Sequence, residues 1–240
     1  MKALNACNQR GGRMLSLVDL LGDDSLSLPM AGYLAAAMRQ GASLLVGANP
    51  GGAGKTTVMA ALLNFLPDDV ALQAVDDRAV LSRANETPPG KVCYVAHEIS
   101  PATYYYAYIW GRDVRTFLRL AADGHLIAFN LHAGTLSETR AQLCSQNDAD
   151  PTHLDTVRLK VYLGTAGHRF SMRRWIDRVY EHDGKMDRLL WEERQPGDFV
   201  QRAESAHVSP EATTRYTDLL ADLRERRVRR IGDVRRALVH

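Results

Sequence analysis

Short, uninterrupted apolar runs recur along the first part of the chain, and each is followed by polar residues. Runs of this length, bounded by turn residues, are typical of strands buried on both faces. We therefore predict core strands over Leu44–Gly47, Val70–Val75, Val92–Ala96 and Leu126–His132.

The segments between these runs carry apolar residues at helical spacing. Predicted helices cover Leu15–Leu21, Pro29–Arg39, Thr56–Leu66 and Val114–Ala122. Strands that alternate with helices indicate an α/β fold, in which a mainly parallel sheet is flanked by helices. The polar residues that follow the strands then gather at the carboxyl edge of the sheet, where such folds bind their ligands.

Beyond about Asp150 the pattern changes to alternation of apolar and polar residues. This predicts strands over Val157–Leu163, Phe170–Tyr180 and Met186–Trp191, which form an antiparallel extension of the sheet. A linker over Gln195–Pro210 leads to basic, amphipathic C-terminal helices bent near Gly232. The expected organisation is a helical lead-in over 1–40, the core with its extension over 41–195, and the linker with the basic helices over 196–240.

Two segments between the core strands lack a clear core pattern. Ser82–Gly90 is polar and rich in proline, so we expect a mobile loop there. The tyrosine-rich segment Tyr104–Trp110 follows the helix-start signal Ser100-Pro101 and is predicted to form a surface helix.

A glycine-rich loop lies between the first core strand and the helix that follows it. Its pattern is GxxxxGK[ST], except that asparagine, which tolerates left-handed backbone angles, holds the first position. Main-chain N–H groups of such a loop bind phosphates, its lysine reaches the β- and γ-phosphates, and its hydroxyl ligates Mg²⁺. The predicted nucleotide-binding residues are Asn49, Pro50, Gly51, Gly52, Ala53, Gly54, Lys55, Thr56 and Thr57, with Thr56 also a metal ligand. The alternative is a glycine-rich turn that only caps a helix.

Hydrolysis requires a group that orients water and groups that hold Mg²⁺ and neutralise the γ-phosphate. Glu98 follows a core strand and is the first candidate for the catalytic base, although it could instead complement a helix dipole. His132, at a strand tip, could bind the γ-phosphate or be structural. Asp76 and Asp77 could hold hydrated Mg²⁺ or simply end a strand.

Composition narrows the class of protein. With 240 residues and 45% hydrophobic content, the chain can bury a large core, and its 3 widely spaced cysteines fit neither a disulfide framework nor a zinc site. No apolar stretch approaches the roughly 20 residues that cross a bilayer, and the start has no signal-peptide core. We expect a cytoplasmic protein, with any membrane role peripheral.

The net charge of +2 is too small to predict nucleic-acid binding. Arginines nevertheless outnumber acids over 221–240. A solvated basic face on a packed helix is the simpler interpretation of that segment, and a nucleic-acid or lipid contact is the alternative.

These blocks, in this order, resemble the motor domain of the type II/IV secretion and pilus-assembly ATPases, in particular the branch that drives type IV secretion and tight-adherence pili. Leu15–Leu21 lies upstream of the phosphate loop, Val75–Leu81 resembles the family's acidic Asp box, and Asp123–His125 with Asn130–Ala133 resembles its His box. The resemblance implies a Mg²⁺-dependent ATPase, with His132 as γ-phosphate sensor and Asp76 or Asp77 in the Mg²⁺ shell. It also implies a hexameric homo-oligomer that serves secretion or pilus machinery at the inner membrane.

The chain departs from the family pattern in two ways. Ungapped counting back from Gly124-His125 puts the Walker B glutamate on Tyr108, whereas an insertion over the tyrosine-rich segment puts it on Glu98, which we prefer. The resemblance does not extend to the family's N-terminal domain, which shares in clamping nucleotide and in ring assembly. Candidate replacements for a charge-neutralising arginine are Arg112, Arg140, Arg173 and Arg174.

We therefore expect an ATPase that couples hydrolysis to conformational change. One alternative is a nucleotide-binding regulator or assembly protein with little hydrolysis, which the Tyr108 alignment would favour. Another is a P-loop small-molecule kinase, which would need an acceptor pocket and an arginine-bearing lid.

Overall fold

The computed structural model describes residues 12–49, 51–167 and 171–238. The helices are α2 (Leu17–Gly22), α3 (Leu28–Arg39), α4 (Lys55–Leu63), α5 (Arg78–Arg83), η1 (Ala84–Glu86), α6 (Arg112–Ala122), α7 (Leu136–Arg140), the π-helix η2 (Ala141–Gln146), α8 (Pro151–Asp155), α9 (Pro210–Glu225) and α10 (Ile231–Ala237). The strands are β1 (Leu44–Gly47), β2 (Ala71–Ala74), β3 (Val92–Ile99), β4 (Tyr108–Ile109), β5 (Leu126–Leu131), β6 (Leu159–Ala166), β7 (Arg173–His182), β8 (Asp187–Gln195) and β9 (Asp198–Gln201).

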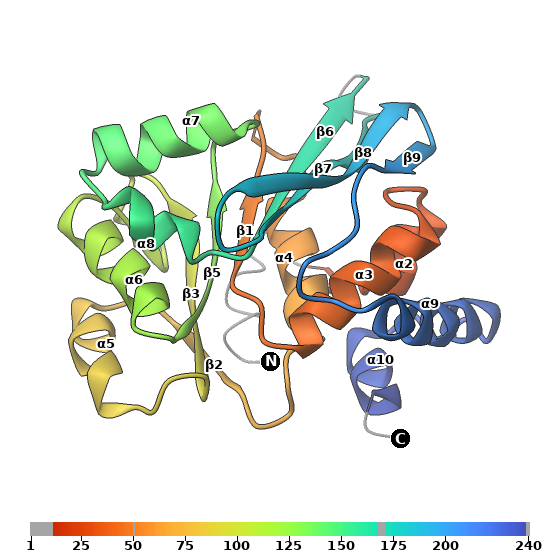
Figure 1. Cartoon of the computed structure of the whole chain (residues 1–240), viewed down its shortest axis with the longest axis horizontal. Helices are drawn as coiled ribbons and strands as arrows, with labels where there is room; N and C mark the ends of the chain where they lie inside the picture. The colour runs from red at the N-terminus through yellow and green to blue at the C-terminus, as the bar shows by residue number, and fades with distance from the viewer. Residues whose placement is uncertain (1–11, 50, 168–170, 239–240) are drawn as a thin grey trace.

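A mixed sheet runs through the molecule in the order β2-β3-β5-β1-β6-β7-β8-β9 (Figure 1). Neighbours from β2 to β6 are parallel, and β4 joins the end of β3 in parallel. From β6 to β9 the pairing is antiparallel. The predicted α/β class, with a mainly parallel sheet and an antiparallel extension, is confirmed.

Helices cover both faces of the parallel part, because alternate strand residues point to opposite sides. Leu44 and Val46 of β1 pack into one core with α3, α4 and α9, whereas Leu45 packs into a second core with α6 and α8. Figure 1 shows α2, α3 and α9 on one side of the sheet and α5, α6 and α8 on the other. The two cores fix β1, which lies between β5 and β6 and leads into the phosphate loop.

Two predicted loops contain regular structure. The first residues of Ser82–Gly90 belong to α5 and η1, because Asp77 caps α5 by accepting from the N–H of Ala79. The expected linker Gln195–Pro210 contains β9, which pairs with β8 and extends the sheet by one strand. A short edge strand of this kind gains its stability from the neighbouring strand, so its own sequence signals it weakly.

The tyrosine-rich segment is not a helix. Ser100 Oγ instead accepts from the N–H of Ala102, which holds a local turn, and Ala107 adopts a left-handed φ of 55°. The chain then forms β4, whose Tyr108 pairs with Glu98 of β3. Because of this pairing, β3 continues through Glu98 to Ile99, beyond the predicted end at Ala96.

The C-terminal helices are present, but the break between them precedes Gly232, which lies inside α10. Helix α9 ends where Arg227 takes a left-handed φ of 56° and Val228 N–H donates to Leu223 O at 2.8 Å. This is a Schellman-type end, which usually uses glycine in place of Arg227.

Helices at both ends of the chain share a core with α4, the helix that follows the glycine-rich loop. Leu17 of α2, Leu220 and Leu223 of α9 and Val234 of α10 are buried in the same cluster as α4. Within the described ranges, no helix combines the length and the apolar character needed to span a membrane. Cytoplasmic placement stays a prediction.

Candidate nucleotide site

The loop between β1 and α4 is built on left-handed glycines. Gly52 has a φ of 85° and Gly54 a φ of 96°, conformations that residues with a side chain rarely adopt. Gly54 caps α4, so Lys55 is the first residue of the helix. Gly47, at the end of β1, also has to lack a side chain, because a Cβ there would lie 2.5 Å from Ala133 O. This close approach brings the loop against the segment after β5.

Asn49, the departure from the usual motif, connects the loop to that same segment. Its Nδ2 donates to Glu138 Oε2 at 2.9 Å, and the N–H of Gly134 donates to the same oxygen at 2.6 Å. Asparagine therefore has a specific role here that glycine could not fill. Pro50, also predicted to bind nucleotide, lies outside the described residues.

The structure brings Lys55, Glu98 and His132 together at the carboxyl edge of the sheet. Lys55 Nζ lies 3.4 Å from Glu98 Oε2 and 3.3 Å from His132 Nδ1. His132 Nε2 lies 4.0 Å from the same Glu98 oxygen. Side chains that are far apart in the sequence thus converge on one point beside the loop.

Burial controls the electrostatics of this group. Lys55 and Glu98 are buried, with side-chain exposures of 7% each, whereas His132 is half exposed at 48%. Desolvation raises the pKa of Glu98 to about 7, although the neighbouring Lys55 acts to lower it. Burial likewise lowers the pKa of Lys55, and burial together with Lys55 lowers the pKa of His132.

One oxygen of Glu98 has a special position. Oε1 is buried and receives no hydrogen bond from the described residues. A buried carboxylate oxygen without a donor is costly, which marks it as an acceptor for a group that enters the site.

Thr56 is held by two residues to which the sequence assigned no role. His97 Nε2 lies 3.1 Å from Thr56 Oγ1, and Asn130 Nδ2 donates to the same hydroxyl at 3.4 Å and to His97 O at 2.8 Å. The sequence signal that could have found Asn130 is the period of two along the predicted strand Leu126–His132, which places Asn130 and His132 on one face. His97 directly precedes Glu98, but its contact with Thr56 depends on how β3 and α4 pack.

The two sequence positions considered for the Walker B glutamate, Glu98 and Tyr108, lie side by side in the sheet. Tyr108 is the register partner of Glu98 and lines the same cavity. Burial, together with the nearby Glu98, raises the pKa of the Tyr108 phenol. The carboxylate that faces the loop lysine is Glu98.

Asp76 and Asp77 are not brought to this group. Both are exposed and lie after β2, which β3 and β5 separate from β1. Asp77 caps α5, and neither residue lines the cavity beside the loop. The sequence placed both at a carboxyl strand end, but it could not show that this strand is at the edge of the sheet.

A second group of metal-ligating side chains lies elsewhere, formed by Asp155, His182 and Asp187. Its carboxylates already pair with cations, because Lys160 Nζ lies 2.6 Å from Asp187 and Arg140 Nη2 lies 2.6 Å from Asp155. This group belongs to an ion-pair network in which the Asp187 side chain is buried and those of Asp155 and Arg140 are partly exposed, so Arg140 already has acidic partners.

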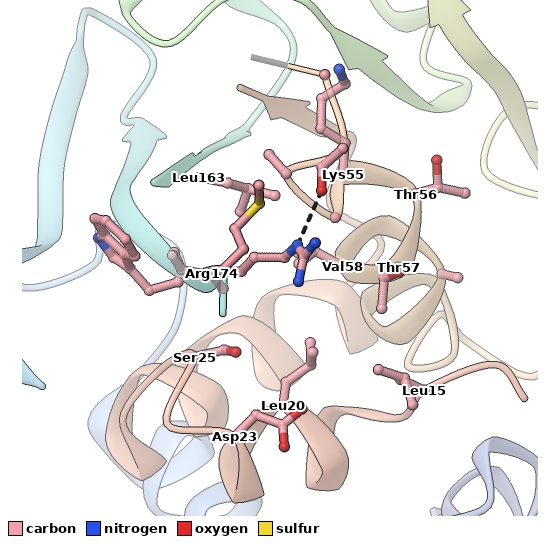
Figure 2. Close-up of a pocket in the computed structure, with 18 of the residues that line it drawn as sticks. Leu15, Leu20, Asp23, Ser25, Lys55, Thr56, Thr57, Val58, Leu163 and Arg174 are labelled. Carbon is pink, nitrogen blue, oxygen red and sulfur yellow. Dashed lines mark hydrogen bonds between the residues drawn. The ribbon is translucent and has the colours of Figure 1, made fainter. Parts of the chain in front are cut away.

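A cavity of about 740 Å³ opens beside the loop. The loop residues from Gly51 to Thr57, with His97, Glu98 and His132, line one part of it, and Leu15, Leu20 and Ile176 line another. Figure 2 shows Arg174 between the loop and Leu20 of α2, and the Lys55 amine directed away from α2.

A parallel sheet in which β1 leads through a glycine-rich loop into α4 defines the P-loop NTPase fold class. Three similar solved structures are ATPases. VirB11 from the Brucella suis type IV secretion system, in complex with sulphate, shares 20% identity with a TM-score of 0.47, over 69% of this chain and 54% of that chain. DotB from Legionella pneumophila shares 14% identity with a TM-score of 0.46, over 88% of this chain and 59% of that chain. DotB from Yersinia pseudotuberculosis shares 11% identity with a TM-score of 0.45, over 86% of this chain and 55% of that chain.

The chain thus spans little more than half the length of the solved structures that it matches. No family model and no curated protein sequence matches it.

Proposed function

We propose that this protein is a Mg²⁺-dependent ATPase of the secretion-motor kind, in which hydrolysis changes contacts within the chain or with a partner. The observation that carries the proposal is the convergence of buried Lys55 and Glu98 with half-exposed His132 beside a glycine-rich loop that leads into a helix. Phosphoryl transfer to water requires a cation that neutralises phosphate charge and a group that orients the water, which an ammonium and a carboxylate can supply. An imidazole beside them can add a hydrogen bond to a phosphate oxygen.

Each residue has a distinct role in this proposal. Lys55 leaves its pairing with Glu98 and binds the β- and γ-phosphates. Ionised Glu98 then accepts a proton from the attacking water through Oε1, which has no other donor among the described residues. His132, at the exposed rim, donates a hydrogen bond to the γ-phosphate and loses that partner when phosphate leaves.

The Thr56 hydroxyl fits a magnesium ligand because His97 and Asn130 hold its Oγ1 in place. A bound Mg²⁺ would neutralise charge on the β- and γ-phosphates. Asp76 and Asp77 have no role in this proposal.

Phosphate release and nucleotide binding test the proposal together. Glu98→Gln keeps the side-chain shape and should retain ATP while losing turnover by about 100-fold or more, because the base is removed. Lys55→Ala should lose nucleotide binding itself. The matched control is Glu86→Gln, an exposed acid of η1 outside the cavity, which should behave as wild type.

Other outcomes identify the competing functions. ATP binding without turnover in the wild type would indicate a nucleotide-binding regulator. Phosphate transfer to an added acceptor in preference to water would indicate a kinase. Absence of ATP binding at millimolar Mg²⁺ would exclude an ATPase, an ATP-binding regulator and an ATP-dependent kinase.

We further propose that the chain acts as a homo-oligomer in secretion or pilus machinery, on the basis of the motif resemblance. Sedimentation with and without a non-hydrolysable ATP analogue tests this, and an assembly stabilised by the analogue is expected. A stable monomer under both conditions would contradict a ring motor.

A further inference from the structure

The cavity has two chemically different ends, and Arg174 stands between them. At one end are the ionisable groups Lys55, Glu98 and His132. At the other end, the wall consists mainly of apolar side chains of the α2 region and of β6 and β7, with the polar Asp23 and Ser25 among them. The apolar ones are Leu15, Leu20, Leu163 and Ile176. If the proposed function holds, the γ-phosphate lies at the ionisable end and the nucleoside extends toward the apolar end.

Arg174 comes from β7, in the antiparallel extension, yet it contacts the phosphate loop. Its Nε donates to Gly52 O at 3.0 Å, and its Cδ lies 3.6 Å from the position that a Cβ on Gly54 would occupy. Figure 2 marks this bond and shows Arg174 on the side of the loop toward α2, whereas the Lys55 amine points away from α2. The side chain therefore covers the rim of the loop that faces away from the Lys55 amine.

The charge of Arg174 is not neutralised within the described part of the chain. No acidic side chain there forms an ion pair with it, and neither terminal nitrogen of its guanidinium donates a hydrogen bond to a described residue. The neighbouring Arg173 is different, since it pairs with Glu193 and lies 4.5 Å from the Trp175 ring centroid. A guanidinium held by Nε alone still presents its fork to an oxyanion.

Taken with the proposed function, on which this inference rests, the geometry points to Arg174 as a second phosphate-binding cation. We propose that it binds the α- and β-phosphates of a nucleoside di- or triphosphate from the nucleoside side of the loop. Lys55 binds the β- and γ-phosphates from the opposite side of the loop. Arg174 leaves Gly52 O when nucleotide enters, so binding displaces a residue of β7 and is felt in the antiparallel extension.

This role differs from that of an arginine that stabilises the γ-phosphate in the transition state. An α- and β-phosphate ligand contributes equally to ADP and ATP, because both contain these groups. A γ-phosphate ligand contributes to ATP and to turnover but not to ADP. The two roles therefore separate when ADP and ATP are compared.

The test is titration calorimetry of ADP and ATP, with Mg²⁺, on wild type, Arg174→Gln, Arg174→Lys and Arg178→Gln. Arg174→Gln should lower the affinity for ADP and the affinity for ATP by a similar factor, about ten-fold, because a charge-assisted contact is lost. The rate at saturating ATP should stay within about two-fold of wild type. Arg174→Lys should recover part of the affinity, since it keeps the charge without the fork.

Arg178→Gln is the matched control, because Arg178 lies on the same strand and pairs with Asp177 at a distance of 3.6 Å, away from the cavity. It should bind as wild type does. If Arg174→Gln keeps the ADP affinity of wild type but hydrolyses ATP more slowly, Arg174 is a γ-phosphate arginine instead. If neither the ADP affinity nor the rate changes, Arg174 is an ordinary surface arginine. Each of these two results would overturn the inference. If wild type binds no nucleotide, or if Lys55→Ala binds as well as wild type, the proposed function itself fails.

Discussion

The Glu98 carboxyl group is the most strongly perturbed acid of the site. Its ordinary pKa would leave it ionised at all physiological pH values, but burial raises this pKa to about 7 in spite of Lys55 at 3.4 Å. The desolvation penalty thus exceeds the attraction of a single ammonium group. A base with a pKa near neutrality is suited to proton transfer in neutral water.

This perturbation predicts a pH dependence of hydrolysis. Only ionised Glu98 can accept a proton, so kcat/KM for ATP should rise as pH increases through about 7, the raised pKa of the free protein. A pH–rate profile between about pH 5.5 and 9, with Tm recorded at each pH, provides the measurement. A profile that is flat across this range, in a folded protein, would rule out Glu98 as the base.

Glu98 should also make the folded state less stable as pH rises. Its folded pKa lies above its ordinary value of 4.5, so the folded state binds more protons than the unfolded state between 4.5 and about 7. The associated stability is therefore present at low pH and is lost as pH increases through this window. Glu98→Gln should reduce this part of the pH dependence of Tm, which thermal melts at several pH values would detect.

His132 should act on ATP and not on ADP. It lies at the ionisable end of the cavity, and its lowered pKa keeps it neutral at neutral pH, so it binds through one N–H. His132→Ala should reduce phosphate release by about ten-fold, the effect of one lost hydrogen bond to a charged group, while ADP affinity stays the same. His153→Ala, outside the cavity, is the control. An equal loss of affinity for ADP and for ATP would mean that His132 contacts a part of the nucleotide other than the γ-phosphate.

At the scale of elements, hydrogen bonds to one carboxylate connect the glycine loop to the segment after β5. Asn49 Nδ2 and Gly134 N–H share the Glu138 oxygen, so this carboxylate joins the start of the loop to the residues that follow His132. A link of this kind would pass loss of the γ-phosphate from His132 to the loop.

A double-mutant cycle tests the link between these elements. Asn49→Ala and Glu138→Ala each remove the same hydrogen bond, so the double variant should differ from wild type by less than the sum of the two single effects. ATP affinity and kcat provide the two readouts, with single effects of about two- to ten-fold for an exposed bond. Strictly additive effects would mean that the two side chains act independently.

The elements also show what local sequence signals leave out. The helix-start signal at Ser100 was wrong because β4 pairs with the end of β3, and this pairing makes the strand the better conformation for Tyr108. The end of α9 was misplaced because Arg227 adopts the backbone angles usually taken by glycine. Both errors arise where a tertiary contact or a cap overrides the intrinsic preference of the residue.

At the scale of the whole molecule, the C-terminal helix α9 packs directly on α3. Gly32 of α3 allows this approach, because a Cβ there would lie 2.8 Å from Thr213 O and 2.9 Å from Thr217 N, both backbone atoms of α9. The C-terminal segment therefore belongs to the core that supports the phosphate-loop helix.

Gly32→Ala should accordingly destabilise the protein by about 1–3 kcal/mol, since α9 must move away from α3. Denaturant unfolding gives this quantity. Gly232→Ala is the control, because Gly232 lies within α10 and a Cβ there meets no atom within 4 Å, so its stability should be unchanged or slightly higher. Equal stability of wild type and Gly32→Ala would mean that α9 is not tightly docked.

The sequence by itself determined the order of the core strands and main helices along the first part of the chain, the glycine loop, and the choice of Lys55, Glu98 and His132 as candidate reactive side chains. These features follow from local physics: hydrophobic period, the backbone angles of glycine, and residue chemistry at strand ends. Strand order in the sheet was decided only by the tertiary structure. It separated Asp76 and Asp77 from the loop and brought Arg174 to it, because proximity in space depends on which strands pair.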